Sequence, residues 1–280
     1  MTFSTSQAPT VALRDGEQIP QLGFGVFQVP PEETAEAVTR ALLAGYRHID
    51  TAAGYRNEAG VGQAIHAAGL DRDDVFITTK CANDHHGFDQ SQRALKGSLA
   101  RLEIDHVDLY LIHWPVPSQD RYVETWQGLI ESQAQGLTRS IGVSNFQPAH
   151  LARIVDATGV TPVVNQIELH PRLQQPGLRR EHADRGIVTE AWSPLAKGRV
   201  LDDPVIVAIA EAHERTPAQV VLRWHLQLGN VAIPKSVTPD RIQQNIEVFD
   251  FELTAADMGA ITALGSGERV GPDPETFDVA

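Results

Sequence analysis

Four residues in the first half of the chain have side chains suited to passing a proton to an oxygen atom: Asp50, Tyr55, Lys80 and His113. A tyrosine is a poor acid at neutral pH because its pKa is about 10. An adjacent ammonium group lowers that pKa, and a carboxylate can hold the ammonium in place. A histidine can donate a hydrogen bond to a carbonyl oxygen. The set therefore fits protonation of an oxygen while hydride reaches the carbon beside it.

A second group of residues is suited to holding a phosphate. Thr238 and Pro239 predict the N-cap and first position of a helix, which places Arg241 in its first turn. A helix N-terminus offers unpaired N–H groups and partial positive charge. Lys235 and Ser236 come just before it, so the segment predicts a phosphate pocket. A solvated helix start explains the same spacing equally well.

A third group offers neutral hydrogen-bonding groups and an aromatic surface. Ser144, Asn145 and Gln166 carry donors and acceptors that suit a carboxamide, and Trp192 offers a flat face for an aromatic ring. Hydrogen bonds within loops and packing in the core are the alternative roles of these four residues.

Composition narrows the class of protein. The 280 residues carry a formal net charge of -13, which argues against nucleic acid or an anionic membrane as the main partner. The lone cysteine, Cys81, cannot form an internal disulfide, which fits a reducing compartment. The sequence contains no secretory signal and no apolar run of about 18 residues. A cytoplasmic protein is expected.

Strand and helix patterns alternate along most of the chain. Asp15 and Gly16 predict a hairpin turn near the N-terminus. Short apolar, β-branched segments then predict eight strands, at residues 22–26, 47–50, 75–80, 107–113, 140–144, 163–168, 187–192 and 231–233. Helical patterns lie between them, at residues 30–44, 57–68, 88–102, 121–135, 147–158 and 175–185, with two more in 204–228. The second of these two opens at Thr216, with Gln219 as its capping-box partner.

This alternation predicts a parallel sheet, and eight repeats fit a closed (β/α)₈ barrel better than an open sheet. The phosphate-binding glycine fingerprint of open dinucleotide-binding sheets is absent after the first strand. The strands are nearly continuous apolar runs, so an apolar barrel interior is expected. Active sites of such barrels lie at the C-terminal ends of the strands, where the polar residues named above are expected to converge.

Six stretches of the sequence resemble the aldo-keto reductase family. They are residues 45–58, 77–80, 105–115, 142–146, 165–166 and 233–245. The likeness runs from about residue 10 to residue 265, and the most similar group is the bacterial 2,5-diketo-D-gluconate reductases. It implies one barrel domain over residues 1–280, with an N-terminal β-hairpin, extra helices near the C-terminus and a flexible segment at 1–9.

The resemblance also implies an activity, NADPH-dependent reduction of carbonyl compounds by a monomer. The substrates would be aldehydes, ketones or dicarbonyls, including keto-sugars such as 2,5-diketo-D-gluconate and aldehydes like methylglyoxal. By this likeness Tyr55 is the general acid, Lys80 tunes it, Asp50 anchors Lys80, and His113 orients the carbonyl.

The remaining roles that the resemblance implies concern the two ligands. The cofactor residues would be Ser144, Asn145 and Gln166 at the carboxamide, Trp192 on the ring, Lys235, Ser236 and Arg241 at the 2′-phosphate, Gln244 and Asn245 near the adenine, and Ser193, Leu195 and Val237 elsewhere along the cofactor. The residues lining the substrate pocket would be Phe24, Ala52, His113 and Trp114. No metal is implied.

Three other functions fit part of the sequence. A regulatory protein could keep the cofactor pocket without useful catalysis. A barrel hydrolase could bind metal through histidines, of which the candidates are His48, His85, His86 and His113, although their spacing is not that of known metal motifs. An aldolase could form a Schiff base on Lys80, but this leaves the predicted phosphate pocket unexplained.

Overall fold

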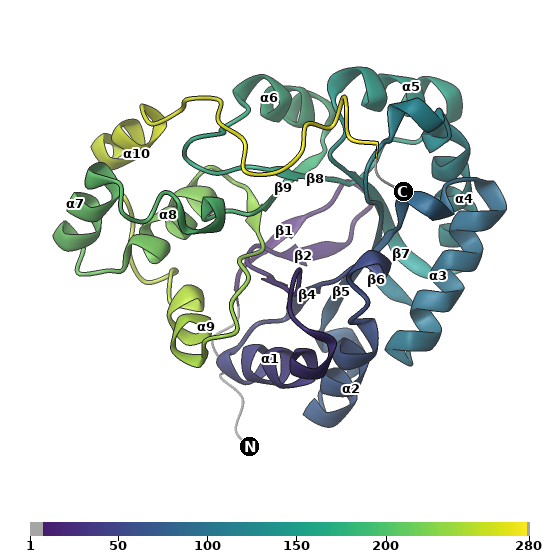
Figure 1. Ribbon diagram of the computed structural model, residues 1–280, viewed down its shortest axis with the longest axis horizontal. Helices are drawn as coiled ribbons and strands as arrows, with labels where there is room; N and C mark the ends of the chain where they lie inside the picture. Colours follow the sequence, from purple (N-terminus) through teal and green to yellow (C-terminus); the bar gives the residue numbers. More distant parts are fainter. Residues whose placement is uncertain (1–7, 279–280) are drawn as a thin grey trace.

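Eight parallel strands form the centre of the computed structural model, which describes residues 8–278 (Figure 1). In chain order they are β3 (Phe24–Gly25), β4 (His48–Asp50), β5 (Phe76–Cys81), β6 (Val107–Ile112), β7 (Thr138–Ser144), β8 (Val164–Glu168), β9 (Val188–Trp192) and β10 (Val231–Ala232). Each pairs with the next in parallel, and the order in the sheet is the order in the chain. The observed strands fall at the predicted segments, with bounds that shift by a few residues.

Backbone hydrogen bonds between the first and last strands close the ring. Leu22 forms a parallel bridge with Ala232. The Gly23 N–H donates to the Ala232 carbonyl at 2.9 Å, and the Ala232 N–H donates to the Gln21 carbonyl at 3.0 Å. The predicted (β/α)₈ barrel is confirmed. All eight strands therefore present their C-terminal ends at one mouth.

Helices surround the barrel and return the chain to the start of the next strand (Figure 1). They are α1 (Pro31–Ala44), α2 (Glu58–Ala68), α3 (Phe88–Leu102), α4 (Tyr122–Ala134), α5 (Pro148–Thr158), α6 (Pro176–Arg185) and α8 (Pro217–Gln227). Helix α1 buries Val38 and Leu42 against the sheet and ends at Gly45, whose φ of 110° suits glycine. The predicted capping box of α8 is formed, because Thr216 and Gln219 each accept a hydrogen bond from the other's backbone N–H.

Three further helices lie in the C-terminal third, as expected: α7 (Pro204–Ala212), α9 (Pro239–Ile246) and α10 (Ala255–Thr262). Helix α7 packs on α8 and α10, and α9 packs on α1 and α8. None of the helices that the structure describes is both long and apolar enough to cross a membrane.

The N-terminal hairpin covers the barrel end opposite the mouth. Its strands β1 (Thr10–Ala12) and β2 (Gln18–Pro20) are antiparallel, and Gly16 has a φ of 99° in the turn between them. Leu13 and Ile19 of the hairpin join an apolar cluster with the barrel residues Phe76, Leu109, Leu111, Val163, Val164 and Val231. The predicted flexible segment 1–9 lies mostly outside the described residues, although the Pro9 carbonyl accepts a hydrogen bond from the Gln21 N–H at 2.8 Å.

The barrel interior is apolar only near the hairpin, so the expectation of an apolar interior is wrong for the end nearer the mouth. Five buried polar side chains lie there: His48, Asp50, Lys80, Gln166 and Glu190. Each is at most 2% exposed. Burying charged groups is costly unless they are paired, and these residues contact one another.

Buried histidines make the stability of the fold sensitive to pH. Burial lowers the pKa of His225 on α8 to about 3, against about 6.5 for an exposed histidine. The unfolded chain therefore binds a proton that the folded chain does not, as the pH falls below about 6.5. The stabilising contribution of neutral His225 is full above that pH and is lost as the pH falls toward 3.

Between about pH 7 and pH 5 the free energy of unfolding should fall for both the parent protein and His225→Gln. We expect the fall to be smaller in His225→Gln, and the difference between the two falls to be about 2 kcal/mol. Urea unfolding at the two pH values measures this difference. The control is His66→Gln, because His66 is exposed on α2. Equal pH dependence in parent and His225→Gln would contradict the assignment.

Candidate active site

A buried lysine joins the predicted proton-transfer residues at the barrel mouth. Lys80 of β5 donates hydrogen bonds from Nζ to Asp50 Oδ1 at 2.7 Å and to the Thr51 carbonyl at 2.9 Å. Its Nζ also lies 3.5 Å from the Tyr55 hydroxyl. Asp50 is the last residue of β4, and Tyr55 follows it in a short 3₁₀ turn, Ala53–Tyr55. The structure thus brings the carboxylate, the ammonium and the phenol together, as the sequence predicts.

His113 completes this group from the end of β6. Its ring lies edge-on to that of Tyr55, with 5.6 Å between the ring centroids. Burial lowers the pKa of His113 to about 3, and the positive charge of Lys80 contributes. His113 is therefore a neutral imidazole over the physiological pH range, able to donate one hydrogen bond.

The pKa of Tyr55 is raised, whereas the sequence led us to expect a lowered value. Burial raises it, and the Lys80 ammonium opposes this only in part. Burial also lowers the pKa of Lys80, but Asp50, Tyr55 and Glu190 together outweigh burial, and the net shift is upward. At neutral pH the site therefore holds a protonated phenol beside a charged ammonium.

The residues predicted to hold a carboxamide form a connected hydrogen-bond network near the ends of β7 and β8. Ser144 Oγ donates to the Gln166 carbonyl at 2.8 Å, and Asn145 Nδ2 donates to the His113 carbonyl at 3.0 Å. Asn145 takes a φ of 66°, a left-handed conformation that asparagine tolerates. Its Oδ1 accepts a hydrogen bond from Trp192 Nε1 at 2.8 Å, which fixes the plane of the indole. Gln166 Nε2 donates to Asp50 Oδ2 at 2.7 Å and links this network to the proton-transfer residues.

The predicted phosphate-binding segment lies at the start of α9. Thr238 is the N-cap and Pro239 the first helical residue, as predicted. Within the described chain no side chain caps the first N–H groups of this helix. Lys235 and Arg241 are exposed beside them. This end of the site is cationic although the chain as a whole is acidic.

One cavity of about 1780 Å³ connects all three groups of residues. Its lining includes Tyr55, His113, Ser144, Asn145, Gln166, Trp192, Ser193, Leu195, Lys235, Ser236, Val237, Arg241, Gln244 and Asn245. Ligand pockets commonly have volumes of roughly 300–1,000 Å³, so this cavity is large enough for a dinucleotide together with a small second molecule.

The structure places the residues predicted for the substrate pocket in two different settings. Trp114 lines the cavity, but Phe24 and Ala52 do not belong to its lining. Phe24 is buried and packs edge-on against Tyr46, with ring centroids 5.5 Å apart. The aromatic residue that faces the cavity from this segment is Phe27, whose ring centroid lies 5.0 Å from that of Tyr55.

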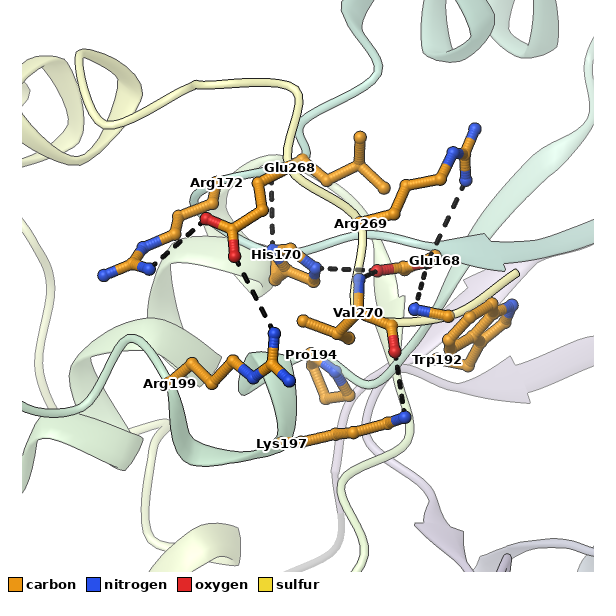
Figure 2. A network of polar contacts seen from close by, with 12 residues as sticks. Glu168, His170, Arg172, Trp192, Pro194, Lys197, Arg199, Glu268, Arg269 and Val270 are labelled. Carbon is orange, nitrogen blue, oxygen red and sulfur yellow. Dashed lines mark hydrogen bonds and ion pairs between the residues drawn. The ribbon is translucent and has the colours of Figure 1, made fainter. Parts of the chain in front are cut away.

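The C-terminal tail forms one wall of the cavity through Gly271, Pro272 and Phe277. Glu168 anchors this tail (Figure 2). The Glu168 carboxylate at the end of β8 accepts hydrogen bonds from the backbone N–H groups of Val270 and Gly271. His170 contacts the same carboxylate at 3.0 Å. Gly271 lines the cavity next to Trp192, where an added Cβ would lie 2.3 Å from the indole. Only glycine lets the tail approach this closely.

The tail is also tied to the loops that follow β8 and β9 (Figure 2). Lys197 Nζ donates to the Val270 carbonyl at 2.9 Å, and Glu268 lies between Arg172 and Arg199 at 3.4 and 3.8 Å. Farther along, Phe277 packs on Trp114 with 4.3 Å between ring centroids. The tail thereby adds a second aromatic wall to the cavity.

Two residues that line the cavity, Phe27 and Phe277, and one that lies beneath it, Glu190, were not identified from the sequence. Phe27 and Phe277 lie in irregular segments, where no periodicity indicates which way a side chain points. Glu190 contacts Gln166 beneath the cavity, with Gln166 Nε2 donating to Glu190 Oε2 at 2.8 Å. The sequence contained enough information to identify Glu190. It is a lone acid in an apolar strand, two residues before Trp192, and residues at this spacing face the same side of a strand.

The candidate metal-binding histidines do not lie close to one another. Over residues 8–278 no group of three or more His, Cys, Asp or Glu side chains is arranged to hold a metal ion. His48 lies inside the barrel against Thr78, whereas His85 is exposed beside Asp84.

The closed barrel and the polar cluster at its mouth define an enzyme of the (β/α)₈ class. The chain belongs to the aldo/keto reductase family, whose model matches residues 21–266. An aldo-keto reductase of Mycolicibacterium smegmatis is 55% identical, with 97% of this chain and 98% of the relative covered. The methylglyoxal reductase DkgA of Escherichia coli strain K12 is 54% identical over 96% of this chain and 98% of the relative. The crystal structure of a Gox0644 mutant in complex with NADPH superposes with a TM-score of 0.93 at 51% identity, covering 97% of this chain and 99% of the other.

The buried ion pair at the centre of the site leads to a test of its stability. Lys80→Met leaves the Asp50 carboxylate buried without its cation, which should lower the free energy of unfolding by about 3–5 kcal/mol. The double variant Asp50→Asn/Lys80→Met should lose less, because it removes both charges. Denaturant titration measures both effects, and Lys96→Met on the exposed face of α3 serves as the control. Additive losses in the double variant would show that the two charges do not stabilise each other.

Proposed function

We propose that this chain reduces the carbonyl group of aldehydes, ketones and dicarbonyl compounds to an alcohol, with NADPH as the reductant. One observation carries the proposal: Lys80 Nζ bridges Asp50 and the Tyr55 hydroxyl, and both of these residues line the cavity. This arrangement supports the assignment of Tyr55 as a proton donor that a small molecule in the cavity can reach. Membership of the aldo/keto reductase family supports the same reaction.

The residues along the cavity suit the successive parts of an NADPH molecule. Ser144, Asn145 and Gln166 would hold the nicotinamide carboxamide, and Trp192 would stack on the ring. Lys235, Ser236 and Arg241 would hold the 2′-phosphate, whose negative charge fits the exposed cations and uncapped N–H groups of α9. Gln244 and Asn245 would lie near the adenine, with Ser193, Leu195 and Val237 along the rest of the cofactor. The similarity to Gox0644, for which a mutant complex with NADPH is known, supports this assignment.

When bound, NADPH supplies the hydride for the carbonyl carbon. Tyr55 donates its hydroxyl proton to the carbonyl oxygen, and the Lys80 ammonium stabilises the phenolate that remains. Asp50 holds Lys80 in place and keeps it charged. Neutral His113 donates a hydrogen bond that orients the carbonyl oxygen.

The walls around Tyr55 favour a small carbonyl substrate. Trp114, Phe277 and Phe27 form apolar surfaces on either side of the Tyr55 hydroxyl and His113. Methylglyoxal is a suitable first probe, because the similar protein DkgA is a methylglyoxal reductase. Keto-sugars such as 2,5-diketo-D-gluconate test whether the same walls admit a longer, more polar molecule.

Replacing the phenol tests the proposed acid. We expect Tyr55→Phe to bind NADPH with an affinity close to that of the parent protein and to lose about 10²- to 10⁴-fold in kcat with methylglyoxal. Cofactor fluorescence measures binding, and the decrease in NADPH absorbance measures turnover. Tyr122→Phe is the matched control, because the Tyr122 hydroxyl contacts Arg153 on the outer layer of helices and should not affect turnover. Parental turnover by Tyr55→Phe would refute the assigned acid, and a parent protein inactive on every carbonyl compound would favour a regulatory role.

Replacing Arg241 tests the proposed 2′-phosphate site. Arg241→Gln should weaken binding of NADPH by about 1–3 kcal/mol, since a charged hydrogen bond to the phosphate is lost. Binding of NADH, which lacks that phosphate, should change little. Fluorescence titration with the two cofactors measures the difference, with Arg40→Gln on α1 as a charge-matched control outside the site. Equal weakening of both cofactors would remove Arg241 from this role.

A further inference from the structure

Glu190 is a buried acid that the proposed proton transfer does not use. It lies in the middle of β9, its side chain is fully buried inside the barrel, and its register partner on β8 is Gln166. A carboxyl group placed in a barrel interior costs free energy, so its presence calls for a role that outweighs the cost. An apolar residue at this position would fill the same space at lower cost.

The amide nitrogen of Gln166 lies between two carboxyl groups. Gln166 Nε2 donates to Asp50 Oδ2 at 2.7 Å and to Glu190 Oε2 at 2.8 Å. An amide nitrogen has two hydrogens, and both are used. The Asp50 carboxylate is paired with Lys80 and only accepts hydrogen bonds, so the opposite orientation of the Gln166 amide would place its oxygen against an acceptor.

This orientation leaves the Gln166 side-chain oxygen for a ligand. Gln166 lines the cavity, and among residues 8–278 no donor to this oxygen is found. We propose that Glu190 is a positioning residue of the site: together with Asp50 it binds both amide hydrogens of Gln166 and so keeps the Gln166 oxygen turned toward the cavity, where it accepts a hydrogen bond from the cofactor carboxamide. The inference rests on the proposed function, since it assigns a role within the same cofactor site.

The groups around Glu190 also couple its charge to the proton donor. His48 and Asp50 face it from β4, Lys80 from β5 and Gln166 from β8. Burial raises the pKa of Glu190 to about 8, and Asp50 adds to this shift. Burial lowers the pKa of His48 to about 3, so His48 brings no positive charge at neutral pH. Ionised Glu190 raises the pKa of Tyr55. Removing the acid should therefore let Tyr55 lose its proton at a lower pH.

The test is Glu190→Gln, which keeps the size of the side chain and replaces its ionisable carboxyl group with an amide. Its amide can donate to the Gln166 oxygen and turn it away from the cavity, so we expect about a fivefold rise in the Kd for NADPH, the effect of one lost hydrogen bond. We also expect the basic limb of the kcat–pH profile to move to lower pH, because turnover needs protonated Tyr55. A parental Kd together with a parental pH profile would overturn the proposal.

A second buried glutamate supplies the matched control. Glu58 is fully buried, contacts Thr79 and Arg101, and forms no hydrogen bond with Gln166 in the described chain. Glu58→Gln should leave both the Kd and the pH profile at the parental values, even where it lowers stability. If it shifts them as Glu190→Gln does, the effect is one of general packing and the positioning role is refuted.

Two further measurements separate this inference from the proposed function. In a double-mutant cycle, Glu190→Gln should add nothing to the Kd of Gln166→Met, and an additive effect would overturn the proposal. In the parent protein, NMR should show that the side-chain amide protons of Gln166 exchange slowly with water. Their chemical shifts should change with pH near 8. This measurement does not depend on whether the variants fold. Failure of the parent protein to bind NADPH would refute the proposed function itself, whereas normal parental turnover with fast-exchanging Gln166 amide protons would refute only the role of Glu190.

Discussion

The ion pair between Lys80 and Asp50 is the constraint on which the rest of the site depends. Both groups are almost completely withdrawn from water, and their Nζ–Oδ1 distance is 2.7 Å. Neither charge could remain in the barrel without the other, because an isolated buried charge loses or gains a proton instead. Both groups form further hydrogen bonds: Lys80 also donates to the Thr51 carbonyl, and Asp50 also accepts from Gln166. The pair therefore fixes the relative positions of β4, β5 and β8, and it brings a permanent positive charge close to the Tyr55 hydroxyl.

The sequence was sufficient to predict the barrel and most of its mouth. Alternating apolar strands and amphipathic helices predict a parallel sheet, and a closed parallel sheet places every strand end at the same opening. Asp50, Lys80 and His113 each end or follow such a strand, so no knowledge of side-chain packing was needed to bring them together. The start of α9 was predictable for a different reason, because the fixed φ of Pro239 suits the first position of a helix and needs no tertiary contact.

Features that depend on three-dimensional packing were not predictable in the same way. Strand β3 has only two residues, too few for an alternation to show that Phe24 packs on Tyr46 while Phe27 reaches the cavity. The tail is held by Glu168, which precedes Val270 by 102 residues, and nothing in either segment indicates the contact. The direction of the Tyr55 pKa shift was predicted wrongly, because the sequence shows which charges lie nearby but not how deeply the phenol is buried. Burial is a property of the whole fold and outweighs the neighbouring ammonium.

The acidic character of the protein is compatible with an anion-binding site because charges act over short distances in salt solution. Screening limits interactions between exposed charges to about 8 Å at physiological ionic strength. The net charge of -13 therefore reduces the attraction of extended polyanions, which contact a wide surface, more than that of a single phosphate. At the start of α9 the local field comes from Lys235, Arg241 and the helix N-terminus, and Asp240 is the one acid within that first turn. An overall negative charge and a cationic end of the cavity are thus two separate features, and only the second bears on which cofactor the site prefers.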